Sequence, residues 1–325
     1  MSGTHGHSHS HSHSALPHNH TRAKLTSRAA IASVSMAIGL LGLKAWASIE
    51  TGSIAMLGSL ADTGLDIIAS LVTLYSVKLA AQPADQDHRF GHGKAEALAA
   101  LFQTGIIVAS ALAIGWRGIS LIGNDAKPSH PELGIAVSIV AIIATLILIT
   151  YQRYVVKQTG SVAIHADHVH YSSDVALNAS VIAALVLDSI LGVRGADPLF
   201  GVAIAAWLLW HAREVASTAI DQLMDKEWPP EKRARFLSVA ESHPELRGIH
   251  DMRTRTSGAH DFVQFHVWVD PEMTVLNAHR VMDEVEAKLM AEFPGTEVLI
   301  HPDPEGHEAE ELGYVPDVTS EHIED

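Results

Sequence analysis

The chain has 325 residues, of which 47% are hydrophobic, and it carries a formal net charge of −15 at pH 7. It contains no cysteine, which excludes disulfides, thiolate metal sites and cysteine nucleophiles. The acidic balance argues against a nucleic-acid partner, because phosphate neutralisation requires a basic protein surface. The 22 histidines are far more than a protein core needs, and histidine is a common metal ligand.

The N-terminal segment interleaves histidine with serine in "HGHSHSHSHSALPHNH", which holds seven histidines in 16 residues. We expect residues 1–24 to form a disordered arm that gathers metal ions with low affinity. An inert tail and a purification tag are the alternatives, and the interleaved serines argue against the tag.

Six apolar segments follow, up to about residue 220. The strongest are charge-free runs at 29–43, 97–116 and 133–152, and the last two have 20 residues each. A bilayer core about 30 Å thick requires about 20 helical residues. The weaker candidates carry polar interruptions or are short, and they lie at 52–80, 162–191 and 198–211. The sequence therefore predicts six transmembrane helices over residues 25–220. No small-residue cleavage pattern marks the first run as a signal peptide.

Positive charges gather in alternate loops of this predicted domain. They are Arg22, Lys24, Arg28, Lys78, Arg89, Lys94, Arg153 and Lys157. The intervening loops hold little more than Arg117, Lys127 and Arg194. Because loops rich in Lys and Arg stay in the cytoplasm, both termini are expected there.

Residues 221–304 have the composition of a soluble domain. Helix, two strands, helix and a last strand are predicted in "PPEKRARFLSVAESHPEL", "GIHDMRTRTSG", "DFVQFHVWVD", "TVLNAHRVMDEVEAKLMAEF" and "TEVLIHPD". This α-β-β-α-β order predicts a small cytoplasmic α+β domain. Residues 305–325 are predicted to be a disordered acidic tail, since nine acids and no Lys or Arg lie between Asp303 and Asp325.

One polar stripe lies on the segment "HADHVHYSSD". At 100° per residue, Asp167, His170 and Asp174 share one helix face with Asn178, whereas His165 and His168 point elsewhere and are expected at the membrane interface. Asp167 lies one turn closer to the cytoplasm than His170, and we expect it to line the path by which a metal ion arrives.

The second apolar segment carries a matching pair, Asp62 and Asp66, on one helix face. Two carboxylates this close repel each other unless a cation or protons separate them. At 1.5 Å per residue, Asp62 lies roughly 15 Å deep from one side, and His170 and Asp174 lie roughly 14 to 20 Å deep from the other. Both pairs should therefore meet near the midplane. Three carboxylates and one imidazole suit a tetrahedral divalent ion such as zinc. Helix-helix hydrogen bonds or a proton relay without metal are the alternatives.

Several motifs in this order resemble the cation diffusion facilitator family, and most closely its bacterial zinc, cadmium and ferrous-iron efflux branch. The resemblance covers about residues 25 to 305 and rests on "ADTGLDIIAS", "QPADQDHRFGHGKAEALAAL", "ADHVHYSSD", "HDMRTRTSG", "FVQFHVWV" and "VLIHPDP". It implies a homodimer of six-helix protomers, each with a metallochaperone-like cytoplasmic domain. It also implies export of a divalent metal ion in exchange for protons.

The resemblance places a transport site on Asp62, Asp66, His170 and Asp174, in agreement with the helical stripe. It places a second site on Asp85, His88 and His92 in the loop after the second helix, where Asp87 is an alternative ligand. A third site in the cytoplasmic domain falls on His250, His266, His279, His301 and Asp303. Strand alternation puts His266 on the face opposite Val263, Phe265, Val267 and Val269. Pro302 stands where members of the family often carry Gln, which leaves the stoichiometry of the third site open. A salt bridge between the two domains is implied for Lys94 and Asp225.

The sequence therefore predicts a zinc/proton antiporter that also binds zinc as a regulatory ligand. Cd²⁺, Fe²⁺, Co²⁺ and Mn²⁺ remain open, since selectivity depends on geometry and availability, whereas the absence of sulfur disfavours copper(I). A membrane metalloenzyme is disfavoured because no "HExxH" motif occurs. A metal sensor or store without transport would share the soluble ligands, but it gives no reason for charges buried at the midplane.

Overall fold

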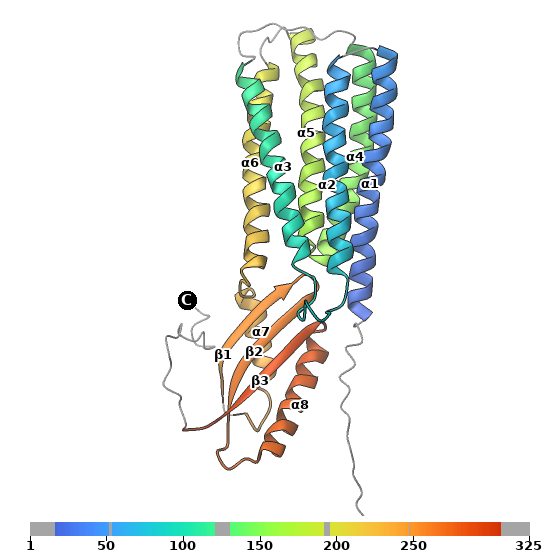
Figure 1. The fold of residues 1–325 in the computed structure, drawn as a ribbon. Helices are drawn as coiled ribbons and strands as arrows, with labels where there is room; N and C mark the ends of the chain where they lie inside the picture. Colours follow the sequence, from blue (N-terminus) through green and yellow to red (C-terminus); the bar gives the residue numbers. More distant parts are fainter. Residues whose placement is uncertain (1–16, 52–53, 121–130, 192–195, 247, 307–325) are drawn as a thin grey trace, which may run out of the picture.

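The computed structural model describes residues 17–51, 54–120, 131–191, 196–246 and 248–306. These residues form a long helical bundle and a smaller C-terminal domain below one end of it (Figure 1). Of the arm expected over residues 1–24, residues 1–16 lie outside the described residues, whereas residues 17–24 form the beginning of the first long helix. The acidic tail from residue 307, Lys127 and Arg194 also lie outside the described residues.

Six long helices make up the bundle. They are α1 (Pro17–Thr51), α2 (Ile54–Ala80), α3 (Ala95–Ser120), α4 (Pro131–Thr159), α5 (Val162–Leu191) and α6 (Ala196–Leu223). Among the described residues, five helices contain stretches long and apolar enough to cross a membrane: Thr21–Glu50, Asp62–Ala80, Ala95–Ser120, Ala136–Thr159 and Leu199–Leu223. Helix α5, which carries "HADHVHYSSD" in its first half, is not among the five. The protein is thus a multi-pass membrane protein.

Small residues line the contacts between these helices. Those that are fully buried include Ala29, Ala30, Ala97, Ala100, Ala163, Ala166, Ala212 and Ala219. Small side chains let helix backbones approach closely. Helices associate in lipid mainly through such close packing, because the hydrophobic effect contributes little to association there. Large apolar side chains point outward instead, among them Ile49, Trp116, Ile147 and Leu199. The helix pairs α3–α6, α1–α2 and α4–α5 make the most extensive contacts.

The C-terminal domain has the predicted element order. It contains α7 (Pro230–Ala240), β1 (Ile249–Ser257), β2 (His260–Val269), α8 (Val275–Glu292) and β3 (Thr296–Pro304). The sheet order is β1-β2-β3; β1 and β2 pair antiparallel, and β2 and β3 pair parallel across the α8 connection. The core lies between the sheet and the two helices and includes Phe236, Phe265, Val281, Leu289 and Val298.

The alternation of β2 separates the two faces of this sheet. Val263, Phe265, Val267 and Val269 are buried in the core, whereas Gln264, His266 and Trp268 on the other face are partly or fully exposed. The predicted strand parity is therefore confirmed, and histidine is left on the face that the helices do not cover.

The junction between the two domains is tight. The predicted ion pair is present, because Lys94 Nζ lies 3.0 Å from an Asp225 carboxylate oxygen. Gly93 lies against the β1–β2 hairpin so closely that a Cβ added there would be 2.2 Å from the carbonyl oxygen of Ser257. Next to it, the guanidinium of Arg255 lies 4.2 Å from the ring centroid of Phe90.

Candidate metal centres

A cluster of three potential ligands lies inside the helical bundle, where α2 meets α5. Asp66, His170 and Asp174 each offer one ligand atom, and these atoms all lie within 4.8 Å of one another. His170 Nε2 is 3.0 Å from Asp66 Oδ1, and only 6% of His170 is exposed. The i, i+4 spacing of His170 and Asp174 puts both on the α5 face that meets α2. One imidazole and two carboxylates converge here, which is a donor set that suits zinc and similar divalent ions.

Asp62 is not part of this cluster in the structure. It lies one helical turn before Asp66 on α2, and it is exposed. It nevertheless lies close enough to interact electrostatically with Asp174, as does Asp66. Three of the four ligands predicted for the transport site are therefore together, and the fourth lies beside them.

In the structure Asp167 does not line an open path by which a metal ion could arrive. Its carboxylate has no exposed surface and is occupied by donors from three other helices. Ser33 Oγ of α1 donates to Oδ2, as does Gln152 Nε2 of α4 at 2.7 Å, and Gln103 Nε2 of α3 donates to Oδ1 at 2.9 Å. Asp167 therefore ties α5 to its neighbours, because a buried carboxylate needs such partners.

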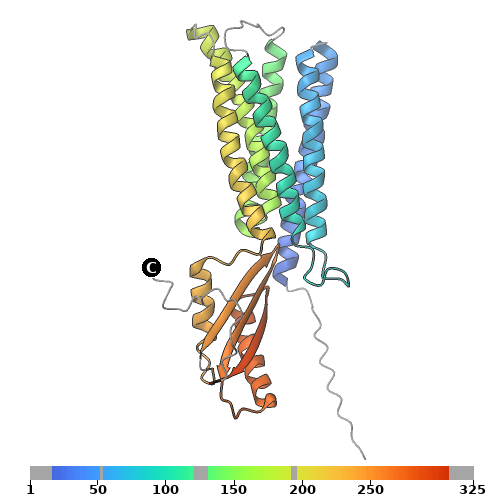
Figure 2. The same ribbon diagram turned by 60° about the vertical axis from the view of Figure 1, so that its left-hand side comes forward.

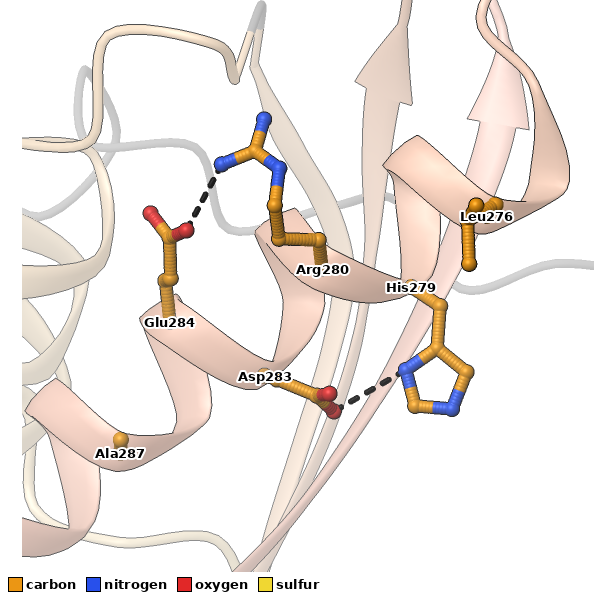
Figure 3. A pocket seen from close by; sticks show the side chains of 6 residues that line it. All are labelled: Leu276, His279, Arg280, Asp283, Glu284 and Ala287. Carbon is orange, nitrogen blue, oxygen red and sulfur yellow. Dashed lines mark hydrogen bonds and ion pairs between the residues drawn. The ribbon is translucent and has the colours of Figure 1, made fainter. Parts of the chain in front are cut away.

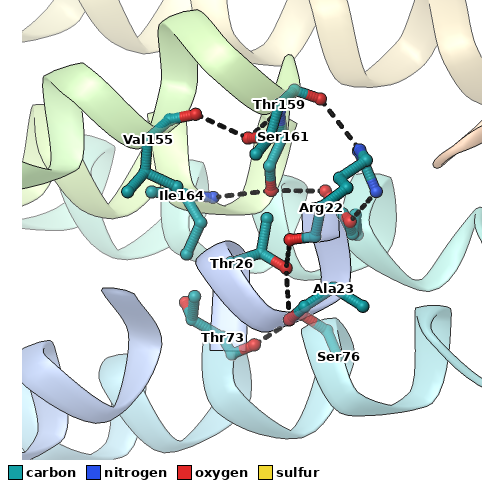
Figure 4. Close-up of polar contacts among 10 residues, drawn as sticks. Arg22, Ala23, Thr26, Thr73, Ser76, Val155, Thr159, Ser161 and Ile164 are labelled. Atoms are coloured by element: carbon teal, nitrogen blue, oxygen red, sulfur yellow. Dashed lines mark hydrogen bonds and ion pairs between the residues drawn. The ribbon is translucent and has the colours of Figure 1, made fainter. Parts of the chain in front are cut away.

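A second buried acid closes the end of the bundle next to the C-terminal domain. Glu96 is 1% exposed and accepts from Arg22 of α1 at 3.0 Å and from the hydroxyl of Ser161 at the start of α5. Arg22 Nε also donates to the carbonyl of Thr159, the last residue of α4, at 2.8 Å (Figure 4). These contacts join α1, α3 and the α4–α5 turn. Arg22 was predicted only as a loop charge, and the single glutamate in the first turn of α3 was the signal in the sequence for its partner.

The loop between α2 and α3 holds a second ligand cluster, made of Asp85, His88 and His92. Both Asp85 oxygens lie 3.3 Å from an imidazole nitrogen, one from His88 Nδ1 and the other from His92 Nε2. The backbone N–H of His88 donates to Asp85 at 2.6 Å, and this hydrogen bond is the main cause of the lowered pKa of that carboxyl. Asp87 contributes its backbone N–H to Asp85, and its carboxylate is not in the cluster.

The third cluster spans the uncovered face of the C-terminal sheet. His250 of β1, His266 of β2 and Asp303 of β3 lie on adjacent strands, and His266 pairs directly with His250. Asp303 Oδ2 is 2.8 Å from His266 Nδ1 and 3.2 Å from His250 Nε2. His301 is more exposed, but its Nε2 lies 3.3 Å from the other Asp303 oxygen. Four of the five residues predicted for this site are thus together, with three histidines around the Asp303 carboxylate.

His279 is the fifth, and the structure does not bring it to the cluster. It lies on α8 with 73% of its side chain exposed, and its Nδ1 is 3.1 Å from Asp283 one turn later. Figure 3 shows the His279 ring directed toward Asp283, in a shallow pocket that Leu276, Arg280, Glu284 and Ala287 also line.

Two residues that shape the third cluster were missed in the sequence. Trp268 stacks on the ring of His250, with centroids 4.2 Å apart and planes 13° from parallel. Asp251 has a φ of 48°, and a bulge between His250 and Arg253 re-aims this end of β1. Trp268 shares the strand parity of His266, so its face was predictable, whereas the bulge had no clear signal in the sequence.

Comparisons with known proteins agree with this architecture. Residues 30–224 match the cation efflux transmembrane domain, and residues 228–305 match the cytoplasmic domain of cation efflux proteins. The cation-efflux pump FieF of Cronobacter sakazakii is 41% identical over 286 residues, covering 88% of this chain and 95% of that protein. FieF of Serratia proteamaculans is 42% identical over 282 residues, covering 87% of this chain and 94% of that protein.

Three solved structures each match about a quarter of the chain. The metal-bound C-terminal domain of the CzcD transporter from Thermotoga maritima is 26% identical, covering 24% of this chain and 95% of that chain, with a TM-score of 0.23. The putative zinc transporter CzrB in its Zn form is 34% identical, covering 26% of this chain and 98% of that chain, with a TM-score of 0.25. The two matched domains together take in nearly the whole described chain, so the protein belongs to the cation efflux, or cation diffusion facilitator, family of membrane transporters and is not an enzyme.

Proposed function

We propose that the protein exports a divalent metal ion, in the first place zinc, from the cytoplasm in exchange for protons. The observation that carries this proposal is the cluster of Asp66, His170 and Asp174 between α2 and α5. Ionisable side chains inside a membrane domain are costly and mark ion pathways. In this proposal all six long helices span the inner membrane, α5 included, because α5 lies within the bundle and bears two of the ligands.

Asp62 completes the transport site as a fourth ligand in this proposal. It lies one turn from Asp66 and within electrostatic reach of Asp174, so a small rotation of α2 brings its carboxylate to the other three. A tetrahedral set of oxygen and nitrogen donors suits Zn²⁺. Cd²⁺, Fe²⁺, Co²⁺ and Mn²⁺ are alternative substrates, because donor type alone does not separate these ions.

Transport follows alternating access around this site. Metal ligation requires deprotonated carboxylates and neutral imidazole, so binding from the cytoplasm displaces protons, and protons arriving from the other side drive release. In this proposal the structure represents a state closed toward the cytoplasm, which is supported by the contacts of Arg22, Glu96 and Ser161 between helices at one end of the bundle. Toward the other end, the α1–α2 pair stands apart from α3 and α6 (Figure 2), and Asp62 is exposed.

The two other clusters are proposed as regulatory zinc sites. Asp85, His88 and His92 form the loop site, and His250, His266, His301 and Asp303 form the site of the cytoplasmic domain. His279 lies too far from that sheet face in its own chain, and we propose that it acts at the interface of a homodimer. Both termini are cytoplasmic, and the N-terminal histidine arm gathers metal for the transporter.

Zinc uptake into proteoliposomes under a pH gradient tests the proposal. Asp66→Ala and Asp174→Ala should each abolish uptake, while Glu214→Ala, which removes an exposed acid of α6, should leave it unchanged. A pH-sensitive dye inside the vesicles should report protons moving opposite to zinc. Uptake that survives Asp174→Ala would refute the site, and zinc flux without counter-flow of protons would refute the antiport.

A further inference from the structure

One charged side chain inside the bundle has no place in the proposed ligand set. Lys44 is the only charged residue between positions 29 and 49 of α1. The other charges of the span Thr21–Glu50 lie near its ends. Lys44 is six residues before Glu50, or about 9 Å along the helix. An ammonium at this depth is costly unless it has a partner or reaches the interface.

A lysine near a helix end usually extends its ammonium toward the interface. Lys44 does not follow this pattern. Its Nζ donates to Thr63 Oγ1 at 2.6 Å, and Thr63 is fully buried on α2. The side chain is therefore directed across the α1–α2 contact and into the bundle.

This contact places the ammonium beside the proposed transport site. Thr63 follows Asp62 directly and lies three residues, almost one turn, before Asp66. Lys44 also interacts electrostatically with Asp174 on α5. The cation thus faces the proposed ligands from α1, the helix that supplies none of them.

The formal charges of the proposed ligands, Lys44 and a bound divalent ion add up to zero. Asp62, Asp66 and Asp174 carry three negative charges when they ligate a metal, and His170 ligates as a neutral imidazole. A divalent ion supplies two positive charges, and the ammonium of Lys44 supplies the third. Only with a divalent ion is the loaded site neutral, and neutrality is strongly favoured where water is excluded.

We propose that Lys44 is a fixed counter-charge that sets the valence of the ion accepted by the transport site. Its ammonium balances the excess carboxylate, so divalent ions are preferred over monovalent and trivalent ones. It also repels the bound metal, which keeps affinity low enough for release. This inference rests on the proposed function, and it deepens that function by naming a residue that determines specificity without binding the metal.

The test compares neutral and charged replacements in the reconstituted full chain. Lys44→Gln removes the charge, Lys44→Met does so with an apolar chain of similar length, and Lys44→Arg keeps it. Lys78→Gln, which changes an exposed lysine in the last turn of α2, is the matched control. Zinc uptake is measured against zinc concentration, and then with Tb³⁺ added as a trivalent competitor.

Without the ammonium, the half-saturating zinc concentration should fall at least about tenfold, because a positive charge that interacts with the ligand Asp174, and therefore repels the bound metal, is lost. The maximal rate should fall as well, because release slows. Tb³⁺ should inhibit both neutral variants more strongly than the wild type, since three carboxylates then match a trivalent ion. Lys44→Arg and Lys78→Gln should behave like the wild type. A purely structural role for Lys44 would not increase the affinity for zinc or for Tb³⁺.

Two outcomes separate this inference from the proposed function. If Asp174→Ala abolishes uptake but Lys44→Gln and Lys44→Met keep wild-type half-saturation and Tb³⁺ sensitivity, the counter-charge is refuted and the transport site stands. Weaker zinc binding in the neutral variants would refute it equally. If Asp174→Ala transports normally, the transport site and the counter-charge both fail.

Discussion

Replacing Arg22 by Met should strongly destabilise the helical bundle. The substitution leaves the Glu96 carboxylate at 1% exposure with the Ser161 hydroxyl as a remaining donor, and it frees the carbonyl of Thr159. Removing one partner of a buried ion pair costs about 3–5 kcal/mol, because the charge left behind is uncompensated. The free energy of unfolding should therefore fall by about that amount.

An exposed ion pair of the same chemistry serves as the matched control. Arg235 and Glu292 lie 2.5 Å apart, but 64% and 47% of their side chains are exposed. Exposed pairs contribute about 0–1 kcal/mol, so Arg235→Met should change stability little. The two Arg→Met variants differ mainly in the burial of the partner carboxylate.

The double variant Arg22→Met/Glu96→Gln tests whether the unpaired charge of Glu96 causes the loss of stability in Arg22→Met. If the cost comes from an unpaired buried charge, neutralising Glu96 should restore part of the stability that Arg22→Met loses. The free energy of unfolding is measured in mixed micelles by titration with a denaturing detergent. The four proteins compared are the wild type, Arg22→Met, Arg235→Met and the double variant. An Arg22→Met loss under about 1 kcal/mol, or a double variant less stable than Arg22→Met alone, would refute the assigned role of the pair.

Two further predictions concern the junction between the domains. Gly93→Ala brings a Cβ to 2.2 Å from the Ser257 carbonyl oxygen, so the β1–β2 hairpin must move away, and the free energy of unfolding should fall by about 1–3 kcal/mol. As the control, Gly105→Ala meets no atom within 4 Å, and the thermal midpoint of this variant should not fall. Burial lowers the pKa of His260, and the positive charge of Arg22 lowers it further. The folded protein therefore binds this proton less readily than the unfolded chain, and stability should fall as the pH drops below about 6.5. Thermal midpoints between pH 7.5 and 5.5 should decline less in His260→Asn; an unchanged slope would contradict this.

The parts of the fold that follow from local periodicity were predictable. Helix-length apolar runs and strand alternation led to the element order of both domains, because each pattern reflects the backbone geometry of one element. The i, i+4 spacing of His170 and Asp174 likewise puts both side chains on one helix face whatever the neighbours are. The structure brings these two residues to Asp66, which depth along two antiparallel helices already indicated.

For Asp167 the sequence indicated the direction of the side chain but not its hydrogen-bond partners. A helical wheel placed Asp167 on the same stripe as His170, but it could not show that Ser33, Gln103 and Gln152 would enclose its carboxylate. Their separations along the chain from Asp167 are 134, 64 and 15 positions. Contacts over such distances depend on how α1, α3 and α4 pack around α5.

The sequence by itself thus determined the helices, the strands and the ligand types, because these depend on spacing within single elements. Only the tertiary structure decided which buried charges gather in a candidate ligand cluster and which hold helices together. Asp66, Asp167 and Glu96 are all acids within the bundle, and their different roles come from the neighbours that packing gives them. Lys44 is a similar case: the sequence shows a charge within a membrane span, and only the contact with Thr63 of α2 directs that charge toward the proposed transport site.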